Sequence, residues 1–158
     1  MKLLLSLLFT IGLLSANAQP RQSIYYLKND GKEVRKPDRA DYRRVITEPD
    51  SGSKFYRVQE FYNNGKPKLT GQSTSIYSLR FDGICTSYYT SGIIAKINHF
   101  SNGDLTQKQQ YFYPNGKLYQ ELTYPDSADN NNNSFGGEYV INTAGDSTGN
   151  LLVVNGLR

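Results

Sequence analysis

The fold is decided by the stretch Tyr111-Phe-Tyr-Pro-Asn-Gly-Lys-Leu-Tyr-Gln-Glu-Leu-Thr-Tyr124. Strand-forming aromatic residues lead into Pro-Asn-Gly, a combination that is typical of a tight turn between two antiparallel strands. After the turn, Leu118, Gln120 and Leu122 alternate with Lys117, Tyr119, Glu121 and Thr123, which is the pattern of a strand with two different faces. The stretch therefore predicts a β-hairpin.

The same turn recurs along the chain with an aromatic residue, a tyrosine, a variable residue, Asn or Ser, and Gly. The copies are Phe61-Tyr-Asn-Asn-Gly65, Tyr88-Tyr-Thr-Ser-Gly92 and Phe112-Tyr-Pro-Asn-Gly116, with Tyr26-Leu-Lys-Asn-Asp-Gly31 as a looser relative. The turn glycines Gly31, Gly65, Gly92 and Gly116 are 34, 27 and 24 residues apart. Phe81-Asp-Gly83 and Phe100-Ser-Asn-Gly103 predict turns at the opposite end of the hairpins. Near-regular spacing indicates one small unit that stacks on its neighbours to bury a face.

We therefore predict an all-β fold, an antiparallel meander of repeated β-hairpins in a single-layer or thinly covered sheet. Residues 19–52 form an N-terminal hairpin region in this prediction, with strands at 23–27, 32–34 and 41–47, and residues 53–124 contain the repeats. Only 36–44 has a composition that tolerates helix, and Pro37 interrupts it. Residues 125–136 are polar and predict a flexible loop.

Residues 137–158 predict C-terminal strands at 138–141 and 150–155, on either side of the segment 143–149. The end of the chain then reads as an Asn155-Gly156 turn without a return strand. Two expectations follow. Either the last strand lies inside the sheet with a frayed end, or the chain is the front part of a longer, TonB-like envelope protein.

The first 18 residues have the features of a secretory signal peptide. Lys2 precedes an apolar run, and Ser15-Ala-Asn-Ala18 supplies a small-x-small cleavage site. The apolar run is shorter than the roughly 20 residues that a spanning helix needs. We expect an exported protein that begins at Gln19, without a membrane span after cleavage, in the periplasm, at the outer membrane or outside the cell.

Charge and cysteine content exclude several classes of protein. Cleavage leaves 17 basic and 14 acidic residues, a mild excess that predicts no nucleic-acid partner. Cys85 is the only cysteine, so the chain forms no internal disulfide. His99 is the only histidine, so the chain has no two-histidine metal site, and a catalytic triad would have to be built around this residue alone. We predict no enzyme, with no catalytic residue, no cofactor and no metal ligand.

The Tyr-Tyr-x-Asn-Gly-Lys units resemble the variant MORN repeats of the YwqK-type antitoxin family, also found in exported proteins of the Bacteroidetes. The resemblance covers roughly residues 55–124, although this chain lacks the tryptophan of MORN units. It implies a hairpin-repeat fold and, as one alternative, an antitoxin or immunity role. Asp126-Ser-Ala128 and Asp146-Ser-Thr148 are similar to O-glycosylation acceptors of exported Bacteroidetes proteins, which makes Ser127 and Ser147 candidate glycosylation sites.

The abundance of tyrosine, 13 residues with no tryptophan, admits two interpretations. Opposed aromatic rings stabilise a thin sheet, and tyrosines on a flat face also suit a wet binding surface. The candidate binding residues are Tyr62, Tyr89, Tyr111, Tyr113, Tyr119, Lys66, Lys68 and Lys117. We predict an exported module that binds an unknown protein or an envelope glycan, with a glycan-binding or glycan-active protein as a further alternative.

Overall fold

A computed structural model describes residues 20–124, 140–148 and 150–157; side chains are described up to Thr123 and again at 145–148 and 150. The strands are β1 (Gln22–Leu27), β2 (Tyr42–Thr47), β3 (Tyr56–Tyr62), β4 (Pro67–Ser73), β5 (Gly83–Tyr88), β6 (Ile94–Ser101), β7 (Asp104–Leu105), β8 (Gln107–Phe112), β9 (Leu118–Tyr124), β10 (Val140–Gly145) and β11 (Leu151–Leu157).

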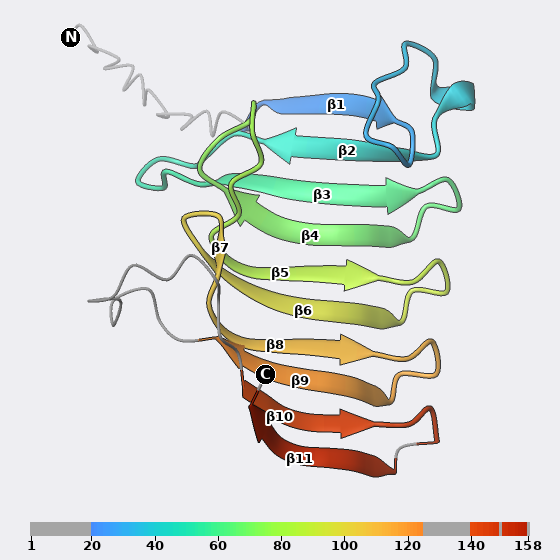
Figure 1. The fold of residues 1–158 in the computed structure, drawn as a ribbon. Coiled ribbons are helices and arrows are strands. Elements are labelled where there is room, and N and C mark those ends of the chain that lie inside the picture. The colour runs from blue at the N-terminus through green and yellow to red at the C-terminus, as the bar shows by residue number, and fades with distance from the viewer. Residues whose placement is uncertain (1–19, 125–139, 149, 158) are drawn as a thin grey trace, which may run out of the picture.

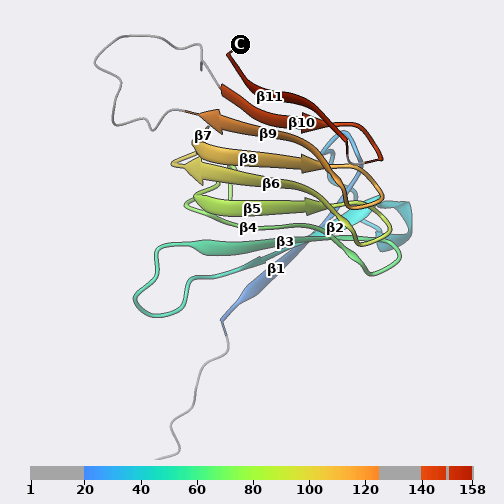
Figure 2. The ribbon, with the colours of Figure 1, turned by 90° about the horizontal axis from the view of Figure 1, so that it is seen from below.

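All eleven strands belong to one sheet in which neighbours along the chain lie side by side (Figure 1). Each pair is antiparallel, and β7 departs from the path by pairing with β6 alone. Figure 2 shows the strands following one another as one twisted layer. The predicted all-β meander of hairpins is therefore confirmed.

The repeated turns lie at the same end of the strands (Figure 1). They also share one backbone conformation. In the second turn the Gly65 amide donates to the Tyr62 carbonyl, and the Tyr62 amide donates to the Lys66 carbonyl, both at 2.9 Å. The same two bonds form at the turns of Gly31, Gly92 and Gly116. All four glycines have φ between +81° and +91°, a left-handed conformation that costs other residues energy.

A fifth turn of the same kind joins β10 to β11. The Asp146 amide donates to the Asn150 carbonyl at 2.9 Å, and Gly145 lies opposite Leu151 just as Phe112 lies opposite Leu118. The sequence-based interpretation of Asn155-Gly156 as a turn is wrong, because β11 continues through Leu157 and Gly156 pairs with Ile141. The repeat was missed because an aspartate stands where the other turns have tyrosine or lysine.

Two smaller predictions also need correction. Phe81-Asp-Gly83 ends the long connection 74–82 and does not itself close a hairpin. The predicted strand 32–34 is reduced to one bridge between Leu27 and Glu33. The segment 36–44, whose composition offered little support for helix, contains a 3₁₀ turn at Pro37–Arg39 and the first residues of β2. The Phe100–Gly103 turn does close a tight hairpin, between β6 and β7. Predictions for 1–18 and 125–136 lie outside the described residues.

A ladder of tyrosine hydroxyls links each turn to the next. The Tyr62 hydroxyl donates to the Tyr88 carbonyl at 2.7 Å, and the Tyr89 hydroxyl donates to the Phe112 carbonyl at 2.6 Å. The Tyr113 hydroxyl continues the series to the Gly145 carbonyl at 3.2 Å. Each tyrosine is the second residue of its motif and each acceptor is the residue just before the next turn. We call these three bonds the tyrosine ladder.

Asparagine and lysine reinforce the ladder in the second and fourth turns. Asn64 donates through Nδ2 to the Thr90 carbonyl at 3.0 Å, and Lys66 donates through Nζ to the Ser91 carbonyl at 2.6 Å. The fourth turn repeats both bonds from Asn115 and Lys117 to the fifth turn. The third turn has Ser91 and Ile93 at these positions, so only its tyrosine reaches across.

The fifth turn ends the ladder. Its Asp146 carboxylate accepts hydrogen bonds from Thr148 and Asn150 within the same turn. The bond from the Thr148 side chain is the largest of the causes that lower the pKa of Asp146 to about 2. An ionised, internally bonded aspartate replaces the tyrosine that would reach toward another turn.

The two faces of the sheet differ in burial. Residues paired across strands point to the same side, so the registers place Tyr42, Val58, Glu60, Cys85, Gln109 and Leu122 on one face, which we call the core face. All six are buried. Phe81 packs here too, with its ring 3.2 Å from where a Cβ on Gly71 would lie. Burial raises the pKa of the Cys85 thiol to about 12.

We predict that Tyr62→Phe destabilises the protein by about 0.5–1.5 kcal/mol, because the variant keeps the ring and loses one half-buried hydrogen bond. Urea unfolding followed by circular dichroism measures the loss. Tyr77→Phe is the matched control, since the Tyr77 side chain is 95% exposed. Equal stability of the two variants would contradict a structural role for the ladder.

Candidate interaction surfaces

An ion cluster around a buried carboxylate lies on the N-terminal half of the core face. Glu60 is only 3% exposed, and its carboxylate receives Arg44 at 2.6 Å and Lys68 at 2.7 Å. The Lys68 ammonium also lies 3.8 Å from the centre of the Tyr42 ring. Leu69 of β4 lies opposite Glu60, and the next register pair is Pro67 opposite Phe61. This β-bulge leaves Lys68 as an extra residue in β4 and turns its side chain toward the ion cluster.

Polar side chains also fill the other half of the core face. Gln109 is fully buried, accepts the His99 amide at 3.1 Å and donates to the carbonyls of His99 and Thr106. Lys96 lies 5.6 Å from the centre of the Tyr111 ring. The core face thus pairs most of its buried polar groups, with the Asn98 Oδ1 atom as an exception among the described residues. The opposite side, which we call the open face, is the better candidate for contacts with other molecules.

An apolar band crosses the open face beside the turns. It consists of the register pairs Phe61 and Pro67, Tyr88 and Ile94, and Phe112 and Leu118. Five of the six side chains are half-buried, and Ile94 is 36% exposed. Every pair sits at the same place in its hairpin, so the ladder that aligns the turns also aligns the band.

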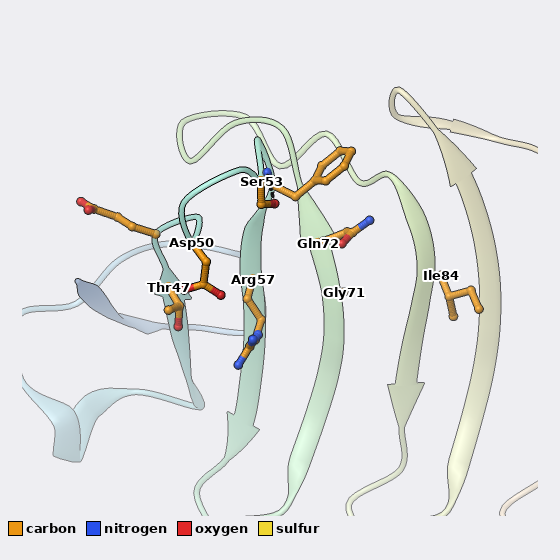
Figure 3. A pocket seen from close by; sticks show the side chains of 9 residues that line it. Thr47, Asp50, Ser53, Arg57, Gly71, Gln72 and Ile84 are labelled. Atoms are coloured by element: carbon orange, nitrogen blue, oxygen red, sulfur yellow. Dashed lines mark hydrogen bonds between the residues drawn. The ribbon is translucent and has the colours of Figure 1, made fainter. Parts of the chain in front are cut away.

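A groove of about 390 Å³ lies on the open face at the end away from the turns (Figure 3). Its polar wall consists of Thr47, Glu48, Asp50, Ser53, Arg57 and Gln72, and Phe55, Gly71 and Ile84 add apolar surface. Thr47, Arg57 and Gln72 are consecutive register partners across β2, β3 and β4. The connection 48–55 folds beside this row and supplies the rest of the wall.

The structure gives the candidate binding residues mostly internal partners. Tyr62, Tyr89, Tyr113, Lys66 and Lys117 make the bonds between turns. Lys68 belongs to the ion cluster and Tyr111 lies against Lys96. Tyr119 packs on Tyr113 with ring centres 5.1 Å apart and is still 46% exposed. Binding by these residues remains a prediction.

Neither the band nor the groove was predicted from the sequence. The band has a signal in the sequence, because the first aromatic residue of each motif belongs to it. The groove has none, since its residues come from four strands, β2 to β5, and the connection 48–55. Ser147 is exposed in the fifth turn, where its carbonyl accepts Asn115, and Ser127 lies outside the described residues.

Among the described residues, no group of three or more His, Cys, Asp or Glu side chains is placed to hold a metal ion. In the same part of the chain, no helix is long and apolar enough to cross a membrane.

Comparison with protein families identifies the repeat class of two hairpins. Residues 81–102 and 106–124 match the MORN repeat variant family. The matched segments contain the third and fourth turns, with strands β5, β6, β8 and β9. Comparisons with curated proteins and with solved structures give no match. The chain therefore contains variant MORN repeats in the middle of its sheet, and the remaining hairpins share their turn geometry.

We predict that Glu60→Ala destabilises the protein by about 3–5 kcal/mol, because it leaves Arg44 and Lys68 without their shared anion. Thermal or urea unfolding measures the change. Lys28→Ala, which breaks the exposed pair with Asp41, is the control and should change the stability far less. A loss at Glu60 no larger than this control would show that the core face does not depend on the ion cluster.

Proposed function

We propose that this protein is an exported, non-enzymatic repeat module that binds a partner protein through the apolar band of its open face. The observation that carries the proposal is the alignment of six apolar side chains across β3 to β9. MORN repeats are generally protein- or membrane-interaction modules, which supports a binding role. Export is supported by the features of residues 1–18.

A protein partner suits the shape of the band better than a small ligand does. Small ligands bind in concave pockets that cover most of their surface. The groove lies at the other end of the strands and none of its lining residues belongs to the band. Aromatic residues are enriched at the centres of protein interfaces, and Phe61, Tyr88 and Phe112 supply three of them. Repeat proteins commonly offer such extended surfaces.

The band predicts a specific crosslinking pattern. A photoreactive benzoylphenylalanine placed at Ile94 in cells that export the protein should give a discrete adduct with another protein, which mass spectrometry identifies. The same group at Tyr77, an exposed residue of the connection 74–82, is the matched control. Ile94→Glu should abolish binding of the identified partner to the purified protein. Adducts of equal yield from both positions would argue against the band as the interface.

Export predicts a defined N-terminus. Protein recovered from the cell envelope or the medium should begin at Gln19, because signal peptidase cuts after small residues such as Ala18. N-terminal sequencing or intact mass measures the cut, and Ala18→Asp should leave the precursor uncleaved. Recovery of the chain only from the cytoplasm, with residues 1–18 attached, would contradict export.

A further inference from the structure

The groove on the open face brings together acidic, basic and amide side chains. Among the described residues, the side chains of Glu48, Asp50, Arg57 and Gln72 have no hydrogen-bond partner, although all four line this one groove. We propose that the groove is a binding site for a short neutral saccharide.

The backbone that carries the acidic wall is hydrogen-bonded at two points. The Glu48 amide donates to the Arg21 carbonyl at 2.8 Å, and the Ser53 amide donates to the Asp50 carbonyl at 3.0 Å. Thr47, at the base of the row, is 5% exposed and accepts Gln22. A preformed site loses less conformational entropy on binding.

Glycine makes room for the amide side of the groove. The Nε2 atom of Gln72 lies 3.2 Å from the point where a Cβ on Gly83 would sit. A larger residue at Gly83 would push the amide aside, and its φ of +73° also disfavours any replacement. Gln72 is therefore positioned between Arg57, its register partner, and the β5 strand.

The chemistry of the wall selects a ligand that is neutral and rich in hydroxyl groups. A carboxylate accepts hydrogen bonds, a guanidinium donates them and an amide does both, which matches the mixed donors and acceptors of a sugar. Two carboxylates disfavour an anion, and Arg57 disfavours a simple cation. Phe55 and Ile84, the latter 57% exposed, offer apolar surface to the C–H face of a sugar ring.

The size of the groove also fits this class of ligand. A volume of about 390 Å³ is at the lower end of the roughly 300–1,000 Å³ of small-molecule sites. It accepts a short saccharide and excludes a folded domain. In Figure 3 Thr47, Asp50 and Arg57 gather on one side of the groove, with Gln72 and Ile84 across it.

The test is a titration of the full mature chain with three probes, namely maltotriose, cellotriose and chitotriose, followed by ¹H–¹⁵N correlation spectra. We expect at least one probe to shift the amides of Arg57, Gln72 and Ile84 while the turn glycines stay unshifted. Arg57→Ala should weaken that binding by about tenfold, the effect of losing roughly one charge-assisted hydrogen bond. Arg57 is exposed and unpaired among the described residues, so the variant should fold.

The control and the contrary outcomes are also defined. Arg39→Ala removes an equally exposed arginine beyond the turn end of β1 and β2 and should leave binding unchanged. The site assignment is overturned if no probe shifts these amides, if a trilysine peptide shifts them and the saccharides do not, or if Arg57→Ala binds like the parent. Hydrolysis of a probe, detected by chromatography, would replace the binding site by an active site. None of these results depends on the apolar band.

Discussion

The hydrogen bond from the tyrosine of one turn to the carbonyl before the next turn is the interaction on which this structure depends. A single-layer sheet has no second layer to cover it, and few of the residues whose side chains the structure describes are fully buried. Each ladder bond, from Tyr62, Tyr89 or Tyr113, links two successive hairpins. The backbone itself joins these hairpins only at the opposite end of the strands. The ladder bonds fix the spacing of the turns where no backbone connection does.

The same motif residues place the apolar band, the surface that we propose binds a partner. In each repeat the first aromatic residue lies on the open face, and the tyrosine that follows it reaches the neighbouring turn. The bulges of the β3–β4 and β8–β9 hairpins each add one residue to the returning strand, and they let Lys68 pack against Glu60 and Tyr119 against Tyr113. A substitution of Tyr89 therefore affects stability, whereas a substitution of Tyr88 affects the apolar band.

The hairpins and their turns could be predicted because their causes are local. Gly65, Gly92 and Gly116 stand where the backbone requires positive φ, and alternation marks the strands that follow. The fifth turn could not be predicted from the motif, because its Asp146 forms hydrogen bonds within its own turn. The roles of the tyrosines could not be predicted either, since no local pattern shows that the Tyr62 hydroxyl reaches a carbonyl 26 residues away. The groove depends on the path of the connection 48–55, which composition does not define.

Hydrogen exchange at the turn glycines tests the central claim most directly. The amides of Gly65, Gly92 and Gly116 bond to the carbonyls of Tyr62, Tyr89 and Tyr113, so their protection reports how firmly each turn is held. In the variant with all three tyrosines changed to phenylalanine, we predict faster exchange at these glycines, while Val58 in the middle of β3 stays protected. Unchanged exchange at all three glycines would contradict the ladder as the interaction that holds the repeats together.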